Sequence, residues 1–535
     1  MLRRNFSSKS AQNSFSNAMN FGKKAHQLVC QKVEGIVSIA EENNRSESTD
    51  IDVYFMPKTS DLMNTITSQL PFNTCANALR NFNADLCEHA FVYPVSKDEK
   101  KRALLVGLGE APKINEMSLR KAVDCAVKQL RQKSITDATF TLPNNLETVP
   151  FTRSCQIFTQ SAMLSNYQFD KYLTNQNQDE DDKLKLKLPL RRISLRAPNN
   201  LKNHIEEQVI VTQETIFARN LGNERADVMT PAFMEKIAME CMELPNVKVT
   251  VLQESDLRKE GMNMFLAVGQ AATCPPRLIL LHYEGDPNST KKIGLVGKGV
   301  TFDTGGLNLK PTGSMETMHM DMCGSAAVFG AFRAAVRLGL KVNIICALGM
   351  AENAIGSKAV KPHAIVKAHN GMTVEISNTD AEGRLVLGDT LSYVQKMHKP
   401  KTLINVATLT GACVVALGEY AAGVFSNEKD LARKIEASGK ECYERCWPLP
   451  IFPEHSAELK GYQSDSRSTG KTRYGGASVA AAFLQQFIEK DVAWAHIDAA
   501  GPCSYSQDHP NFPRGATGFG VHVLYTYLKN HEQSC

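Results

Sequence analysis

The sequence predicts an α/β protein of two domains, a smaller N-terminal α/β domain and a larger C-terminal α/β domain with a central, mostly parallel sheet. Its 535 residues are too many for one hydrophobic core, because single cores stop growing at about 250–300 residues. In the C-terminal part, short apolar runs alternate with helical segments, a pattern typical of a covered parallel sheet. A polar, charge-segregated stretch at 174–192 separates the two parts, and we expect it to be an exposed insertion.

The first 33 residues contain six Lys or Arg and no acidic residue. An acid-free, Arg- and Ser-containing, loosely amphipathic leader is typical of a mitochondrial transit peptide. We therefore predict a leader at 1–33 and a mitochondrial location, with a cytoplasmic protein that has a basic disordered terminus as the alternative.

That leader also explains the net charge of the chain. Without its six basic residues the charge of +5 becomes −1, so the rest of the chain offers no basic excess for a nucleic-acid partner. No apolar run approaches the ~18 residues of a membrane-spanning helix, so we expect no membrane insertion.

The N-terminal domain is predicted to span 34–200. An amphipathic helix at 118–133 places Ala122, Ala126 and Leu130 on one stripe. Strand-like runs lie at 50–56, 89–95 and 102–109. No group of catalytic side chains occurs here, so we interpret this part as an accessory domain.

The C-terminal domain is predicted to span 201–535. A helical segment is expected at 324–339. Short strands that we expect to be buried in the sheet lie at 292–297, 342–348, 373–377, 402–409 and 492–498. Sheets of this kind bind ligands at the carboxyl ends of their strands, so the stretches that follow the strands are the candidates for function.

Acidic residues gather in two of those stretches. The glycine-rich loop after 292–297 carries Asp303 and Asp321, and the stretch NTDAEGRL (378–385) carries Asp380 and Glu382. If the strand ends bring them together, four carboxylates cannot all stay ionised without cations. Hard oxygen ligands in this number indicate two divalent metals ~3.5–4 Å apart, whereas each acid taken alone would be an ordinary turn residue.

Three basic residues accompany the acids. Lys298 and Lys310 are counter-ions in the simplest interpretation, but a neutral amine can be a metal ligand and an ammonium group can stabilise an oxyanion. Arg384 neutralises the acids in its simplest interpretation, and it lies in the first turn of a helix predicted at 381–397. The buried stripe expected for that helix consists of Leu387, Leu391, Val394 and Met397.

At this point the sequence resembles the leucine aminopeptidases, the cytosol aminopeptidase family of two-metal exopeptidases. NTDAEGRL is the signature, and the similarity covers nearly all of 205–530. Further matching motifs are VGKGVTFDTGG (296–306), MDMCGSAA (320–327), ATLTGACVVALG (407–418), GGASVAAAFL (475–484), WAHIDAAG (494–501) and GATGFGV (515–521).

The resemblance implies roles for individual residues. Metal ligands would be Lys298, Asp303, Asp321, Asp380 and Glu382, with Asp303 and Glu382 bridging the two metals. Lys310 would polarise the scissile carbonyl, and Arg384 would hold a bicarbonate that shuttles protons. Substrate-binding positions would be Lys310, Met318, Asn378, Thr408, Leu409 and Gly411.

The resemblance also implies what the whole protein does. It would release N-terminal residues, leucine-like ones preferred, from peptides, with Zn²⁺ or Mn²⁺ and also Mg²⁺ as metals, in a homohexamer. The alternative is a structural or packing protein on the same fold, as in some sperm-abundant relatives. Because 464–478 departs from the family pattern near the substrate pocket, peptide preference is the property that this divergence puts in question.

Overall fold

The computed structural model describes residues 37–40, 49–74, 79–96, 101–173, 188–509 and 512–534. The predicted leader and residues 174–187 of the predicted insertion at 174–192 lie outside these residues. The chain divides into two compact units, one of Gln31–Gln213 with Gln507–Arg514 and a larger one that contains Glu214–Ser506 and Gly515–Cys535. No helix among the described residues is both long enough and apolar enough to cross a membrane.

The smaller unit is built on a six-stranded sheet of order β1-β6-β5-β2-β4-β3. All its strands pair in parallel except β3, which is antiparallel to β4. The strands are β1 (Val37–Ala40), β2 (Ile51–Lys58), β3 (His89–Val92), β4 (Ala103–Glu110), β5 (Asp137–Thr141) and β6 (Arg192–Arg196). The helices are α2 (Leu62–Gln69), α3 (Glu116–Gln132) and α4 (Phe151–Asn166).

The predicted strands and helix of this unit are confirmed. Helix α3 begins where the Asn115 side chain accepts hydrogen bonds from the main-chain N–H groups of Met117 and Ser118, and it buries Ala122, Ala126 and Leu130 as its pattern predicts.

The larger unit is built on an eight-stranded sheet of order β15-β14-β17-β13-β9-β10-β8-β7. Its centre, β17-β13-β9-β10, is parallel, and antiparallel pairs occur towards both edges. The predicted mostly parallel sheet is therefore confirmed for its central strands. The strands are β7 (Val247–Leu252), β8 (Arg277–Glu284), β9 (Lys292–Asp303), β10 (Asn343–Asn353), β13 (Thr402–Ala407), β14 (Ala422–Ser426), β15 (Cys446–Pro448) and β17 (Ala493–Asp498).

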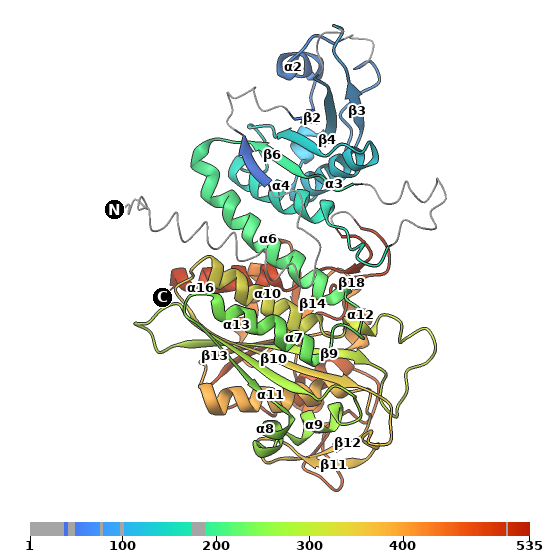
Figure 1. Ribbon diagram of the computed structural model, residues 1–535, viewed down its shortest axis with the longest axis vertical. Helices are drawn as coiled ribbons and strands as arrows, with labels where there is room; N and C mark the ends of the chain where they lie inside the picture. Colours follow the sequence, from blue (N-terminus) through green and yellow to red (C-terminus); the bar gives the residue numbers. More distant parts are fainter. Residues whose placement is uncertain are drawn as a thin grey trace. The chain divides into compact units, whose positions relative to one another are not determined.

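Helices cover both faces of this sheet. In Figure 1, α10, α13 and α16 lie on one side of the central strands and α8, α9 and α11 on the other. Helix α6 (Lys202–Asn223) begins in the smaller unit and ends in the larger one. The helices of the larger unit are α7 (Pro231–Met239), α8 (Glu254–Lys259), α9 (Asn263–Gly269), α10 (Cys323–Arg337), α11 (Glu382–His398), α12 (Gly411–Leu417), α13 (Lys429–Cys442), α14 (Pro453–Ala457), α15 (Gly476–Gln485) and α16 (Val521–Ser534).

Two central strands are longer than predicted. The apolar patterns end at 297 and 348, but β9 and β10 continue side by side to Asp303 and Asn353, with a register shift between Ala351 and Asn353. The glycine-rich stretch after 297 is therefore partly strand, because its backbone keeps a partner in β10. Asp303 consequently sits at the end of the strand itself.

The prediction that 373–377 is a strand of the central sheet is wrong. Strand β12 (Thr373–Ile376) belongs to a separate three-stranded sheet with β11 (Ala364–Lys367) and β16 (Ser466–Arg467). Val374 and Ile376 are buried, whereas Thr373 and Glu375 are only partly buried. Alternation of this kind is typical of a strand with one covered face, whereas the strands of a covered parallel sheet are apolar throughout.

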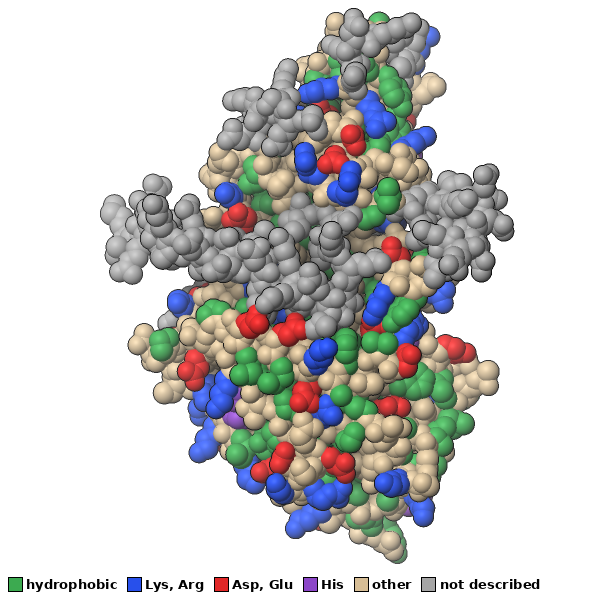
Figure 2. All heavy atoms as spheres, viewed as in Figure 1, with side chains coloured by type: hydrophobic (Ala, Val, Ile, Leu, Met, Phe, Trp, Pro, Cys, Tyr) green, Lys and Arg blue, Asp and Glu red, His purple; other side chains and the backbone are tan. Residues whose placement is uncertain are grey.

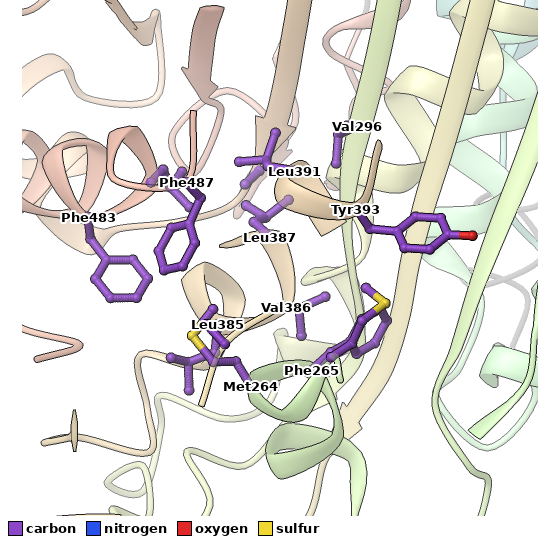
Figure 3. Close-up of a cluster of buried hydrophobic side chains, with 14 of the residues drawn as sticks. Met264, Phe265, Val296, Leu385, Val386, Leu387, Leu391, Tyr393, Phe483 and Phe487 are labelled. Carbon is purple, nitrogen blue, oxygen red and sulfur yellow. The ribbon is translucent and has the colours of Figure 1, made fainter. Parts of the chain in front are cut away.

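Helix α11 is buried all around, and not only along the predicted stripe, from Glu382 to Gln395. Leu387, Leu391 and Val394 lie inside a cluster with side chains of α9 and α15, and Figure 3 shows Leu385, Val386 and Leu387 of this helix among Phe265, Phe483 and Phe487. Met397, predicted to be buried, is 49% exposed, because it lies in the last turn, beyond the buried part of the helix that ends at Gln395. The packing fixes the N-terminus of α11, where Glu382 and Arg384 lie.

Candidate metal centre

One half of the candidate site comes from the end of β9 in the middle of the sheet. Asp303 is the last residue of this strand and is buried. Its Oδ1 accepts hydrogen bonds from the main-chain N–H of Gly305 (2.9 Å) and from Nδ2 of Asn353 (2.8 Å). These two donors fix the carboxylate plane, and Oδ2 lies 2.8 Å from Nζ of Lys310.

The other half comes from the turn between β12 and α11. Thr379 ties this turn to the β9 loop, since its Oγ1 donates to the carbonyl of Gly305 (2.6 Å) and accepts from the N–H of Asn308 (2.8 Å). Gly305 has a φ of +85°, and a Cβ there would lie 2.4 Å from the carbonyl oxygen of Asn308 and 2.9 Å from Oδ1 of Asp380. The glycine therefore permits the two halves to approach closely.

Three carboxylates meet where these halves join. Ligand atoms of Asp303, Asp380 and Glu382 all lie within 4.8 Å of one another. Asp303 and Glu382 are buried, and Asp380 is partly buried. The fourth predicted carboxylate ligand, Asp321, directly follows a short 3-10 helix (Met318–Met320) and is linked to Glu382 through Lys298.

The two lysines lie between the carboxylates. Nζ of Lys298 is 2.7 Å from Oδ1 of Asp321 and 2.9 Å from Oε1 of Glu382, and it also donates to the carbonyl of Thr408 (2.9 Å). Nζ of Lys310 is 2.8 Å from Asp303 and 2.6 Å from Asp380.

These ion pairs keep both lysines charged. Burial by itself would lower the pKa of Lys298, but the negative charges of Asp321, Glu382 and Asp303 outweigh it and hold the pKa above its ordinary value. The pKa of Lys310 is raised in the same way, against burial, chiefly by Asp303. In this arrangement both lysines act as counter-ions of the carboxylates.

The site residues fit divalent cations. Burial, together with repulsion from neighbouring carboxylates, raises the pKa of Asp321 and Glu382 above their ordinary values. Oδ2 of Asp321 and Oε2 of Glu382 are buried without a hydrogen-bond partner, although buried acceptors are normally satisfied. Four carboxylates outnumber the two ammonium groups. A divalent cation bound to these oxygens would give them partners and would also neutralise the excess negative charge.

Arg384 lies in the first turn of α11, beside the acids. Its Nη1 donates to the carbonyl of Ser468 (2.8 Å), and its Nε is buried without a hydrogen-bond partner. Burial lowers its pKa to about 10, while the charges of Glu382 and Asp498 act to raise it. The guanidinium is therefore cationic at neutral pH and keeps one N–H group available for an anion.

The predicted substrate-binding residues come from several elements. Met318 begins the short 3-10 helix before Asp321, and Asn378 precedes Thr379 in the β12–α11 turn. Thr408 and Leu409 follow β13, and Gly411 begins α12. Oγ1 of Thr408 donates to Oδ1 of Asp321 (2.6 Å), so at least this position touches the ligand set directly.

Sequence reasoning missed two buried polar residues that support the site. Asn353 ends β10 and bonds to Asp303, and Asp498 ends β17 and accepts from the N–H groups of Leu409 and Thr410 and from Oγ1 of Thr410. Asp498 lies inside the quoted motif WAHIDAAG, so a signal existed for it. Asn353 lies beyond the apolar run that marked its strand, and no pattern pointed to it.

His319 is the one histidine within the loop from Lys298 to Asp321. It is buried, and burial lowers its pKa below the ordinary value. It is not among the residues that form the carboxylate group.

Buried carboxylates and lysines at the carboxyl end of a central strand of an α/β sheet are a typical arrangement for binding divalent metals. Comparison with known families identifies the class of protein. Residues 216–525 match the catalytic domain of the cytosol aminopeptidase family, and residues 76–176 match its N-terminal domain.

Individual relatives agree with the family match. The chain is 37% identical over 446 residues to a probable cytosol aminopeptidase of Protochlamydia amoebophila, covering 83% of this chain and 87% of the relative. It is 38% identical to that of Aquifex aeolicus, covering 79% and 84%. Among solved structures, the bottromycin maturation enzyme BotP in complex with Mn has a TM-score of 0.79 and 29% identity, covering 91% of this chain and 100% of that one.

The chain therefore belongs to the cytosol aminopeptidase family. It is a metal-dependent aminopeptidase and hence a hydrolase, as the sequence predicts, and the alternative of a structural packing protein is not favoured.

The prediction of a mitochondrial location is wrong. The similar proteins are bacterial cytosol aminopeptidases, which points to a cytoplasmic protein, and the cytoplasmic alternative fits. An acid-free basic leader is a feature of composition alone, and a basic terminus of a cytoplasmic protein shares it.

Proposed function

We propose that the seven predicted residues form the active centre of an aminopeptidase that prefers leucine-like N-terminal residues. The metal ligands are Lys298, Asp303, Asp321, Asp380 and Glu382, and the catalytic residues are Lys310 and Arg384. The observation that carries the proposal is the meeting of three carboxylates within 4.8 Å beside buried carboxylate oxygens that lack partners.

The chemistry divides between the metals and the side chains. When bound, two divalent cations supply Lewis acidity, which lowers the pKa of water towards ~7 and polarises a carbonyl. Lys310 carries an ammonium group beside Asp303 and Asp380. It would donate to the oxygen of the scissile carbonyl as negative charge develops there, and this stabilisation is greater in the transition state than in the substrate.

Arg384 would orient the group that moves protons. Its unpartnered Nε and its place in the first turn of α11 support the binding of a small anion there, because a helix N-terminus favours negative charge. We propose bicarbonate, which supplies proton transfer near the scissile bond.

The proposed metals, substrates and oligomeric state follow from the family resemblance. Zn²⁺ or Mn²⁺, with Mg²⁺ as a further option, are the proposed metals; the manganese of the BotP complex supports Mn²⁺ as the first to test. Peptides with a free N-terminus are the proposed substrates, contacted by Met318, Asn378, Thr408, Leu409 and Gly411. We further propose a homohexamer in which 201–535 is the catalytic domain and 34–200 the accessory domain.

The test is hydrolysis of a leucyl chromogenic amide by protein loaded with Mn²⁺ or Zn²⁺. We expect activity that chelation abolishes and that Lys310→Ala and Asp380→Ala each remove. Activity that survives both substitutions would exclude this site as the centre of catalysis. Metal bound at the site without any hydrolysis would exclude the proposed reaction.

A further inference from the structure

Asn353 contacts both halves of the metal centre from a third element, the end of β10. Its Nδ2 donates to Oδ1 of Asp303 (2.8 Å) and to the carbonyl of Thr379 (3.1 Å), the residue directly before Asp380. Asp303 belongs to β9 of the central sheet, whereas Thr379 follows β12 of the separate three-stranded sheet. One amide group therefore joins ligand-bearing segments that come from two different sheets.

The chemistry of the partners defines how this amide is oriented. A carboxylate and a main-chain carbonyl can only accept hydrogen bonds, so the NH₂ end of Asn353 must face them. The backbone of Asn353 is fixed as well, because its carbonyl accepts from the N–H (3.1 Å) and from Oγ1 (2.7 Å) of Thr304. The donor is thus held at both its main chain and its side chain.

The surroundings of this amide are tightly packed. Asn353 is 3% exposed. Gly306, with a φ of +65°, faces it so closely that a Cβ there would lie 3.1 Å from Oδ1 of Asn353 and 2.9 Å from Oγ1 of Thr379. The asparagine is therefore held in place by close neighbours on the side of the β9 loop.

We propose that Asn353 is a positioning residue for metal binding: it orients the Asp303 carboxylate and holds the β12–α11 turn, which carries Asp380 and Glu382, against the end of β9. The inference rests on the proposed ligand set. Groups that orient metal ligands through hydrogen bonds typically change metal affinity by about 10- to 100-fold when they are removed. Loss of Asn353 would free Asp303 from one of its two Oδ1 donors and leave the Thr379 carbonyl without this amide.

The same strand offers a matched control. Asn343 is the first residue of β10 as Asn353 is the last, and it is also buried. Its Nδ2 donates to the carbonyls of Asp286 (2.9 Å) and Ser289 (2.7 Å) at the opposite end of the strand. Asn343→Ala therefore removes a buried amide with two main-chain acceptors but leaves the metal centre untouched.

The experiment is a calorimetric titration of metal-stripped full-length protein with Mn²⁺, followed by thermal unfolding with and without Mn²⁺. We expect Asn353→Ala to raise the Kd for Mn²⁺ by about 10- to 100-fold and to shrink the Mn²⁺-dependent rise in Tm. Asn343→Ala is expected to lower Tm while keeping the wild-type Kd. Asn353→Ser, whose hydroxyl is too short to reach both acceptors, replaces the alanine variant if that variant does not fold, and the same rise in Kd is expected.

The outcomes distinguish failure of the positioning role of Asn353 from failure of the proposed metal site. Wild-type Mn²⁺ affinity in a folded Asn353 variant, or equal losses of affinity at Asn353 and Asn343, would overturn the positioning role and leave the ligand set intact. Failure of the wild-type protein to bind Mn²⁺, or binding that Asp380→Ala does not weaken, would overturn the proposed site itself.

Discussion

At the scale of single residues, the site gathers several buried charges. Lys298 and Lys310 pair with four carboxylates, and Arg384 keeps a buried Nε without a partner. Buried ion pairs of this kind offset the cost of desolvation only when the remaining lone pairs are satisfied. Function, rather than stability, therefore explains why these charges are gathered here.

Arg384 provides the sharpest test of the proton-transfer role. Because its guanidinium is proposed to hold bicarbonate, Arg384→Ala should lower kcat by roughly 100-fold or more, the usual scale of general acid–base catalysis. Arg384→Lys keeps the charge but lacks the planar fork, so it should recover only part of the rate. The measurement is the rate of leucyl-amide hydrolysis in bicarbonate-depleted buffer and after bicarbonate is added back.

Wild-type protein is the control, and bicarbonate should stimulate it. The alanine variant should show no stimulation at any bicarbonate concentration. Equal stimulation of both proteins would mean that the anion acts elsewhere or that Arg384 does not hold it.

At the scale of elements, the site requires that α10 pack closely on the central strands. A Cβ on Gly324 in α10 would lie 2.3 Å from the carbonyl oxygen of Val406 in β13, and a Cβ on Gly297 in β9 would lie 2.4 Å from Cα of Ser325 in α10. Glycine at both contacts lets the helix approach the sheet backbone to backbone. The start of α10 is thereby fixed, and Asp321 lies two residues before it.

This contact reverses the usual effect of a Gly to Ala change in a helix. In an exposed helix interior, alanine is favoured over glycine by roughly 0.5–1 kcal/mol. Gly324→Ala should instead destabilise the protein by about 1–3 kcal/mol, the usual cost of overpacking, because the clash is with backbone that cannot rotate away. Denaturant unfolding of the variant measures the change.

Gly356→Ala is the control, since a Cβ there would meet its nearest atoms only at ordinary contact distances of 3.6 Å or more. It should change the free energy of unfolding by no more than about 0.5 kcal/mol. A Gly324→Ala protein as stable as wild type would show that α10 can move away from β13.

The arrangement of strands and helices also explains which features can be predicted from the sequence and which cannot. Lys298, Asp303, Asp380 and Glu382 can be proposed from the sequence because acids and lysines next to apolar runs are visible without any structure. The sheet membership of 373–377 was missed because strand pairing is a long-range property, although its alternating pattern pointed to a half-covered strand. Asn353 was missed because its strand continues past its apolar run, held by pairing with β9 rather than by its own hydrophobicity.

At the scale of the whole molecule, buried histidines couple stability to pH. His496 on β17 is fully buried, and Nδ2 of Asn405 donates to its Nδ1 (2.8 Å). The indole N–H of Trp494 donates to Oδ1 of Asn405 (2.9 Å), and because an indole can only donate, the NH₂ of Asn405 must face the histidine. Nδ1 of His496 is thus an acceptor, and a proton there would meet another donor.

Burial and the positive charge of Arg384 keep His496 neutral, although hydrogen bonding to the Asn405 main chain acts to raise its pKa. Desolvation is the largest cause that lowers its pKa, which falls to about 3, whereas an unfolded histidine has a pKa of about 6.5. Above pH 6.5 both states are neutral and the group has no effect on stability. Between about pH 6.5 and 3 the unfolded state binds a proton that the folded state does not, so the free energy of unfolding falls as pH falls, by roughly 1.4 kcal/mol per pH unit.

Other buried groups also titrate between about pH 3 and 7. The contribution of His496 is therefore best obtained as the difference in free energy of unfolding between wild type and a His496 variant. Burial raises the pKa of Asp389 and of Glu444 to about 7, and each of these acids makes the free energy of unfolding rise as pH falls towards its unfolded pKa of about 4. These contributions oppose that of His496 and are common to wild type and variant. Subtracting the two unfolding curves therefore isolates the histidine.

We expect His496→Gln to be less stable than wild type at pH 7.5, because it loses a well-packed ring that stacks on Phe425 with centroids 5.8 Å apart. The glutamine has no proton to bind, so its deficit should shrink by about 2 kcal/mol between pH 6.5 and pH 5. Urea unfolding of both proteins at half-unit pH steps measures this difference, with the same metal and salt concentrations throughout. A deficit that stays constant with pH would mean that His496 titrates alike in the folded and unfolded chain, and one that grows on acidification would mean that the folded protein holds the imidazolium.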